Sequence, residues 1–126
     1  MNSGQISQTL AGIPQIIFAV LIGSQANDMA RPDSDWDVAV WITRDLAGMG
    51  RLSLLEEVRC QIACALDVSP EKIDVVDLAN AGLAMRAAAV NEGVLLKQDK
   101  GSIYNRFLNR TWREIEEFNW EMRRAA

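Results

Sequence analysis

The chain has 126 residues, of which 49% are hydrophobic and 24% charged, and its formal net charge is −4. These values predict one domain with a modest core, and the acidic balance argues against direct binding to duplex nucleic acid. The sequence contains no histidine. This excludes Ser-His-Asp and Cys-His nucleophiles as well as histidine-based zinc hydrolysis.

No apolar run approaches the length that a transmembrane helix needs, and the first residues lack the basic flank of a signal peptide. We therefore expect a cytoplasmic protein that does not act in a membrane. Cys60 and Cys64 lie four residues apart in a helical pattern, a spacing that disfavours a disulfide between them. They are expected to be reduced residues of the core.

In chain order, amphipathic segments alternate with short apolar runs. Expected helices cover residues 3–12, 51–66, 80–90 and 102–124, and expected strands cover 15–22, 35–42, 72–78 and 94–97. Asn80 is the expected cap of the third helix. The order predicts an α/β (α+β) fold over residues 1–126. We expect a short mixed sheet with helices mainly on one face and a carboxylate cleft on the other.

The second strand carries two carboxylates on one face. Side chains alternate along a strand, so Asp35 and Asp37 point the same way, as do Ala39 and Trp41. The opposite face is predicted to be the core face, formed by Trp36, Val38, Val40 and Ile42. Adjacent carboxylates raise each other's pKa unless a cation lies between them, so the pair suits a hard metal ion such as Mg²⁺. Trp41 can either line the cleft or join the core.

A glycine and a serine, Gly23 and Ser24, directly follow the first strand and precede helix-compatible residues. Backbone N–H groups at a helix N-terminus and a serine hydroxyl are suitable donors for phosphate, although a plain strand-to-helix cap is the alternative interpretation. Phosphate donors beside a metal-binding carboxylate pair are what phosphoryl and nucleotidyl transfer require.

The third strand adds two more acids, Asp74 and Asp77. Alternation places them on opposite faces, so only one of them can face the metal site, and alternation alone does not choose between them.

These motifs together resemble a known family. Gly-Ser, ten residues, Asp-x-Asp and a later acidic strand, Asp-Val-Val-Asp-Leu, are similar to the minimal nucleotidyltransferases (MNT) of the DNA polymerase β-like superfamily. The segments 30–35 (Ala-Arg-Pro-Asp-Ser-Asp) and 91–96 (Asn-Glu-Gly-Val-Leu-Leu) resemble the same family. The similarity spans about residues 16–97, so the terminal helix lies outside it.

The resemblance implies a specific site and partner. Gly23 and Ser24 would bind the triphosphate of ATP, Asp35 and Asp37 would hold two Mg²⁺ ions, and Asp74 would be the base or a further metal ligand. It also implies an antitoxin that is encoded beside a HEPN-family ribonuclease toxin. Such an antitoxin acts as a protein adenylyltransferase, transferring AMP from ATP to a toxin hydroxyl, in particular a tyrosine.

The sequence departs from the family pattern at one place. The family usually has Gly-Ser-Arg-Ala-Arg-Gly, whereas residues 23–28 read Gly-Ser-Gln-Ala-Asn-Asp. Two cations near the phosphates are therefore missing, and Asp28 adds a negative charge. Two alternatives stay open: an antitoxin that neutralises its toxin by binding alone, and a small-molecule nucleotidyltransferase of the aminoglycoside type.

The expected terminal helix carries features of its own. Arg106, Arg110 and Arg113 recur at helical spacing and fit either a solvated helix face or contact with an acidic partner or phosphate. Trp112 and Trp120 can either pack on the sheet or anchor a partner, because tryptophan is enriched at interface hot spots.

Overall fold

The computed structural model describes residues 2–27, 31 and 34–125, which form a four-stranded sheet and four α-helices. Every predicted helix and strand is present, with ends within about three residues of those expected. The helices are α1 (Asn2–Ala11), α2 (Gly48–Leu66), α3 (Leu83–Glu92) and α4 (Ile103–Ala125). The strands are β1 (Ile16–Ile22), β2 (Trp36–Ile42), β3 (Ile73–Asp77) and β4 (Val94–Lys97).

The sheet is mixed, with strand order β3-β2-β1-β4. β1 runs antiparallel to both β2 and β4, while β2 and β3 are parallel. A parallel pair needs a long crossover, which α2 supplies between β2 and β3. The predicted α/β (α+β) class and the short mixed sheet are confirmed.

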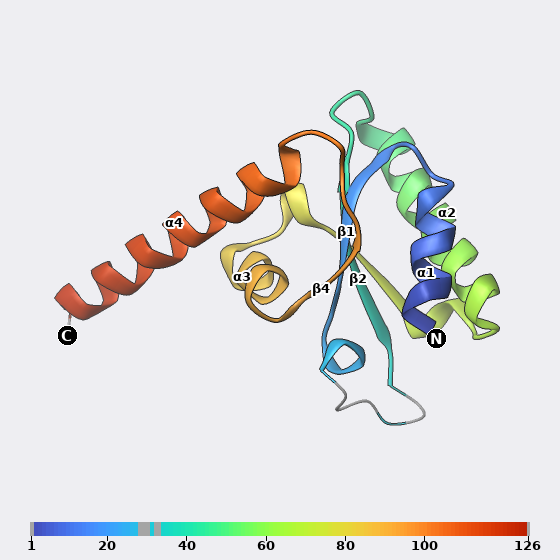
Figure 1. Cartoon of the computed structure of the whole chain (residues 1–126), viewed down its shortest axis with the longest axis horizontal. Helices are drawn as coiled ribbons and strands as arrows, with labels where there is room; N and C mark the ends of the chain where they lie inside the picture. Colours follow the sequence, from blue (N-terminus) through green and yellow to red (C-terminus); the bar gives the residue numbers. More distant parts are fainter. Residues whose placement is uncertain (1, 28–30, 32–33, 126) are drawn as a thin grey trace.

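One face of the sheet is covered by α1 and α2 (Figure 1). α2 places Leu54, Val58 and Ile62 on the sheet at the spacing of an amphipathic helix. The strand side chains beneath them include Val38, Val40 and Ile42, with Trp36 partly buried at the margin. The predicted core face of β2 is therefore confirmed.

The opposite face carries a second, smaller cluster under α3 and the first turns of α4 (Figure 1). Its centre is aromatic: Phe18 stacks on Trp41 with 5.6 Å between ring centroids and meets Tyr104 at 5.0 Å and Phe107 at 5.2 Å. Trp41 thus joins a core cluster while remaining partly exposed. Helices lie on both faces of the sheet, because the aromatic side chains on this face must be shielded from water, as must the larger apolar cluster on the other.

α4 continues beyond the rest of the molecule as a projecting arm (Figure 1). Its buried residues, Phe107 and Thr111, both lie in the first half, whereas Phe118, Trp120 and Met122 in the second half are more than half exposed. Trp112 is 44% exposed. Within the part of the chain that the structure describes, no helix has the length and apolarity to cross a membrane.

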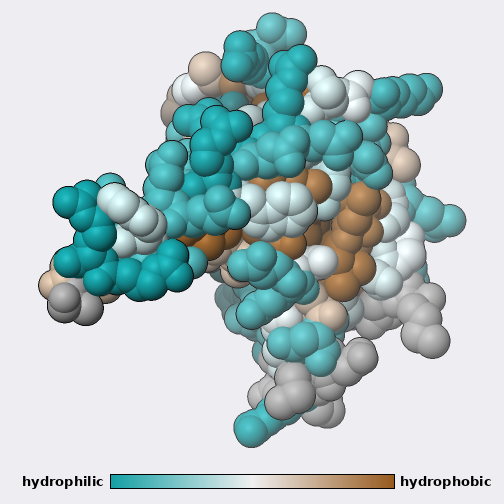
Figure 2. All heavy atoms as spheres, turned by 60° about the vertical axis from the view of Figure 1, so that its left-hand side comes forward, coloured by the Kyte–Doolittle hydropathy of each residue, from teal (hydrophilic) through white to brown (hydrophobic). Residues whose placement is uncertain are grey.

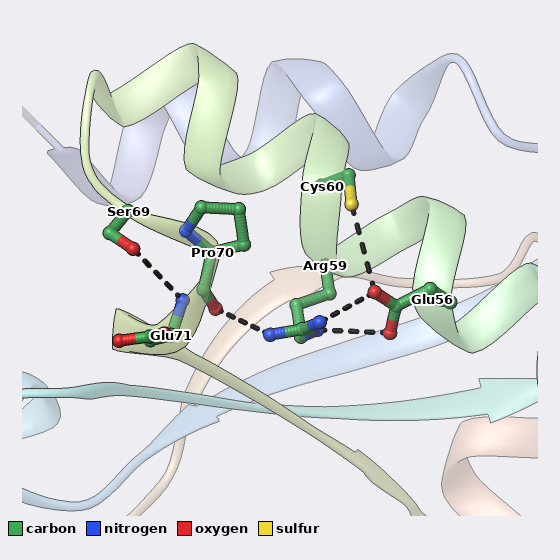
Figure 3. A network of polar contacts seen from close by, with 6 residues as sticks. All are labelled: Glu56, Arg59, Cys60, Ser69, Pro70 and Glu71. Atoms are coloured by element: carbon green, nitrogen blue, oxygen red, sulfur yellow. Dashed lines mark hydrogen bonds and ion pairs between the residues drawn. The ribbon is translucent and has the colours of Figure 1, made fainter.

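The prediction that both cysteines belong to the core is wrong. Cys60 and Cys64 are free thiols on the exposed side of α2, because the buried stripe of this helix uses other positions. Cys60 lies in a surface network in which its Sγ contacts Oε1 of Glu56 at 3.9 Å (Figure 3). Arg59 binds the same glutamate and also donates to the carbonyl of Pro70 at 2.9 Å, which ties α2 to the turn before β3.

Lys97 at the end of β4 links that edge strand to the first helix. Its ammonium donates to the carbonyl of Leu10 at 3.0 Å and to that of Ile13 at 2.9 Å. The Leu10 carbonyl belongs to the last turn of α1 and that of Ile13 follows the helix, and each also accepts a backbone N–H, from Ile13 at 3.0 Å and from Ile16 at 3.1 Å. Burial lowers the pKa of Lys97.

Candidate active site

The corner after β1 is built on Gly23. Its backbone has φ 78° and ψ −162°, a conformation that is essentially restricted to glycine. A Cβ at this position would also collide with Oδ2 of Asp37 on the neighbouring strand. Glycine is therefore required here twice, by its backbone and by the close approach of a carboxylate.

Ser24 begins a single turn of 3₁₀ helix that ends at Ala26. The turn is closed by a hydrogen bond from the N–H of Ala26 to the carbonyl of Gly23 at 3.0 Å. The helix-compatible residues after the Gly-Ser pair thus form one short 3₁₀ turn. The donors at this corner are local N–H groups and the serine hydroxyl, and a helix macrodipole contributes little because it grows with helix length.

Gln25 and Asn27 occupy the two positions where the resemblance to minimal nucleotidyltransferases predicts arginine. The side chain of Gln25 donates to the carbonyl of Ser34 at 3.2 Å and so ties the 3₁₀ turn to the residue before Asp35. Gln25 thus supports the loop without supplying positive charge. Asp28, whose charge bears on phosphate binding, lies outside the described residues.

Two aspartates on neighbouring strands, Asp37 and Asp74, lie beside this corner, and a third, Asp35, directly precedes β2. Asp37 pairs with Ile22 across the antiparallel strands and with Asp74 across the parallel strands. Paired residues of adjacent strands point to the same face and lie about 5 Å apart at their backbones. Asp35 is exposed just before β2. Alternation places the side chains of Asp37 and Asp74 on the face that carries Ala39, Val76 and Leu78.

The electrostatics of Asp37 confirm this proximity. Burial raises the pKa of its carboxyl above the ordinary value, and the neighbouring charges of Asp74 and Asp35 raise it further. Each ionised group makes ionisation of the next one costlier. A cation placed among them would relieve that repulsion.

Asp77 faces the other side of the sheet and has its own cation. Nε and Nη2 of Arg51 donate to its two oxygens at 2.6 and 2.7 Å, and Asn80 donates at 2.8 Å. These bonds, chiefly those from Arg51, lower the pKa of the Asp77 carboxyl although burial opposes them. Asn80 therefore binds Asp77, and Gly82 is the N-terminal flank of α3 in its place.

The sequence analysis missed the partner of Asp77. Arg51 lies 26 positions earlier, near the start of α2, and no periodicity links the two residues. The only available signal was that a half-buried acid on a strand needs a counter-charge.

The donor set at the Asp37 corner fits Mg²⁺, which prefers a few carboxylate oxygens and keeps positions for water and phosphate. Asp35, Asp37 and Asp74 are the residues that could hold it. Among residues 2–27, 31 and 34–125, however, no three acidic, cysteine or histidine side chains are gathered closely enough to form a ready-made metal cage. The corner is thus open, and further oxygen ligands would have to come from a bound substrate or from water.

Comparison with known families gives a direct result. Residues 4–101 match the family described as Polymerase beta, Nucleotidyltransferase. The chain belongs to this family. The matched residues contain the whole sheet, the Gly23 corner and all of the aspartates described above. The resemblance found in the sequence to this nucleotidyltransferase superfamily is therefore confirmed.

Solved structures with the same nucleotidyltransferase fold come from toxin–antitoxin complexes. One such complex, crystallised with AMP-PNP, contains a chain that is 25% identical, with 99% of this chain and 95% of that chain covered and a TM-score of 0.74. The MntA-HepT complex gives 23% identity, coverage of 98% and 92%, and a TM-score of 0.67.

A third complex is that of a tri-AMPylated Shewanella oneidensis HEPN toxin with an MNT antitoxin. It gives 23% identity, coverage of 98% and 92%, and a TM-score of 0.66. Among curated proteins, none matches the sequence. The structural likenesses extend over α4, beyond the part that the family match covers.

Proposed function

We propose that this chain is the antitoxin of a HEPN/MNT toxin–antitoxin pair and acts as a Mg²⁺-dependent protein adenylyltransferase. It would move AMP from ATP to a hydroxyl of the toxin, most simply that of a tyrosine. The observation that carries the proposal is the pairing of Asp37 with Asp74 beside Gly23, with Asp35 close enough to affect Asp37. Similar folds in complexes with AMP-PNP and with a tri-AMPylated toxin support it.

In this proposal the residues have distinct roles. The backbone of Gly23 and the hydroxyl of Ser24 hold the phosphates of ATP. Asp35, Asp37 and Asp74 hold two Mg²⁺ ions, which when bound neutralise phosphate charge and favour ionisation of the acceptor hydroxyl. Asp74, the more accessible of the paired aspartates, also accepts the hydroxyl proton.

The bonds and protons of the proposed transfer are all accounted for without a histidine. The acceptor oxygen forms a bond to the α-phosphorus of ATP, the bond from that phosphorus to the α–β bridging oxygen breaks, and pyrophosphate leaves. The acidic net charge of the chain fits a partner that is a protein, without direct contact to nucleic acid. The cytoplasm, where ATP and Mg²⁺ are available, is the compartment that the proposal requires.

The test uses the purified protein with labelled ATP, Mg²⁺ and the product of the neighbouring gene. We expect label on that product with the natural chain and none with the Asp35→Ala plus Asp37→Ala variant. Asp45→Ala is the matched control, because Asp45 is an exposed aspartate outside the site. Label transfer that survives in the double variant would defeat the assignment.

A second candidate function is an antitoxin that acts by contact alone. It is favoured by Gln25, which bonds to the loop and provides no cation for phosphate. Cells that express the toxin distinguish the two functions. If the Asp35→Ala plus Asp37→Ala variant still restores growth, contact suffices and catalysis is not needed for antitoxin action.

A further inference from the structure

A large groove lies on the α4 side of the sheet, away from the carboxylate corner. Its volume is about 1030 Å³. The floor is apolar and comes from the start of β1, the end of β2, the turn after β3 and the first half of α4. It includes Ile17, Trp41, Leu78 and Phe107. Figure 2, which views the molecule from the side of α3 and α4, shows apolar surface framed by hydrophilic side chains.

The rim of the groove is strongly basic although the protein is acidic overall. Five arginines line it, namely Arg44, Arg86, Arg106, Arg110 and Arg113. Glu114 pairs with Arg86 and with Arg110. Among the described residues, Arg44, Arg106 and Arg113 take part in no ion pair. Thr111 also lines the groove. Its hydroxyl is buried and has no hydrogen-bond partner among the residues that the structure describes.

The second half of α4 carries three glutamates ahead of two terminal arginines, and one of these glutamates, Glu117, also lines the groove. A shallow hollow there is lined by Glu116, Glu117, Trp120 and Glu121. Trp120 is 53% exposed, and the guanidinium of Arg124 lies 4.6 Å from its ring centroid. The arm thus presents acidic and aromatic side chains, which are what a basic groove with an apolar floor would bind.

The two halves match each other in position as well as in charge. With 3.6 residues per turn, positions 106, 110, 113, 117 and 121 lie on one face of α4. That face reads Arg, Arg, Arg, Glu, Glu along the chain. When two copies of the helix are laid antiparallel about the point between residues 113 and 114, Arg106 meets Glu121 of the second copy. In the same alignment Arg110 meets Glu117, and Arg113 meets Glu114.

We propose that this face of α4 is a self-complementary docking surface, on which a second copy of the chain packs with its α4 antiparallel. A two-fold axis creates each of these ion pairs twice, as isologous interfaces require. It also brings the aromatic arm of each copy to the basic groove of the other. The proposal does not depend on the proposed transfer activity, because the carboxylate corner lies at the opposite ends of β1 and β2.

The test measures the mass of the full chain in solution by light scattering or sedimentation over a range of concentrations at low salt. We expect the natural chain to reach twice the mass of one chain. Arg110→Glu alone and Glu117→Arg alone each place like charges in contact twice, so each variant should stay monomeric. An equal mixture of these two variants restores opposite charges at both contacts and should recover the dimer.

Two matched substitutions away from the proposed face act as controls. Arg123→Glu near the end of α4 and Glu57→Arg on the exposed side of α2 make the same charge changes, and both variants should dimerise like the natural chain. Circular dichroism checks that every variant is folded, and raising the salt concentration should dissociate the natural dimer without any substitution.

Three results would overturn the proposal. The first is a natural chain that stays monomeric at every concentration. The second is a dimer that tolerates Arg110→Glu, Glu117→Arg and high salt. The third is a mixture of folded single variants that remains monomeric, which would indicate that the groove binds an acidic partner of another kind.

Discussion

Asp74 and Asp77 lie three residues apart on one strand and have opposite electrostatic surroundings. Asp77 points toward α2, where Arg51 forms a bidentate salt bridge with it. This salt bridge supplies a full counter-charge and lowers the pKa of the Asp77 carboxyl. Asp74 points the other way and lies beside Asp37, whose pKa its charge raises. One aspartate is neutralised by the fold, whereas the other adds to an unrelieved concentration of negative charge.

The difference separates an aspartate that stabilises the fold from one that is available for chemistry. Adjacent charges of like sign cost stability, and they are retained where a ligand relieves them. A bound divalent cation would be such a ligand. The comparison between the two aspartates can therefore be tested in activity and in stability separately.

The largest expected effect is on transfer activity. We expect Asp74→Asn to lower the rate of AMP transfer by about 10²–10³-fold, the range for loss of a group that stabilises the transition state. Asp77→Asn should retain most of the rate at temperatures where it is folded. Labelled ATP and the partner protein provide the assay. Equal losses in the two variants would remove the distinction between the aspartates.

For stability the order is reversed: substitution of Asp77 should have the larger effect. Asp77→Ala leaves the Arg51 guanidinium half-buried without its partner, and we expect the free energy of unfolding to fall by about 2–3 kcal/mol. Asp74→Ala should change it by less than about 0.5 kcal/mol, because it removes an exposed group that forms no ion pair with the described residues. Urea denaturation without divalent cations measures both values. The Arg51→Met variant is the complementary test and should lose a similar amount.

Mg²⁺ should stabilise only those proteins that keep Asp37. A ligand that binds only the folded state at ten times its Kd raises the free energy of unfolding by about 1.4 kcal/mol. We expect a rise in Tm on adding Mg²⁺ to the natural chain and to Asp77→Asn, but not to Asp37→Asn. The same rise in Asp37→Asn would place the cation elsewhere. Sodium chloride at matched ionic strength serves as the control for simple charge screening.

The smallest effect is on the pH dependence of stability without metal. The pKa of Asp37 is raised above 3.8 in the folded state. Between the unfolded pKa and this higher folded pKa the folded state therefore binds more protons, and the free energy of unfolding falls as pH rises through that range. The pKa of Asp77 is lowered below 3.8, so its contribution is present above that value and is lost as pH falls through the folded pKa. The free energies of unfolding of the natural chain, Asp37→Asn and Asp77→Asn are measured from about pH 3 to about pH 7. The difference between each variant and the natural chain should change with pH in opposite directions.

Strand periodicity and turn residues were sufficient to predict most of the fold and part of the site. The apolar run before Gly23, the alternation of acids and apolar residues in β2 and the amphipathic α4 all follow from local pattern. Alternation also predicted that Asp74 and Asp77 would face opposite sides of the sheet, as they do. Which of them faces Asp37 depends on how β3 pairs with β2, a non-local contact that no spacing encodes.

Two expectations about individual residues were wrong. The cysteines fit a helical stripe, but α2 turns a neighbouring stripe to the sheet. Asn80 was the expected helix cap, but Asp77 offers it a charged acceptor. The cysteine error therefore reflects a tertiary contact of α2, whereas the Asn80 error reflects a competing local hydrogen bond to Asp77, three residues away.

The contact between Arg51 and Asp77 has a further consequence for how the strands align. If β3 slipped by one residue against β2, every β3 side chain would turn to the opposite face. Asp77 would then leave the guanidinium, and Asp74 would be driven into the apolar layer under α2. The ion pair therefore penalises misalignment of the parallel strands, and a bond on one side of the sheet keeps the acids on the other side in their relative positions.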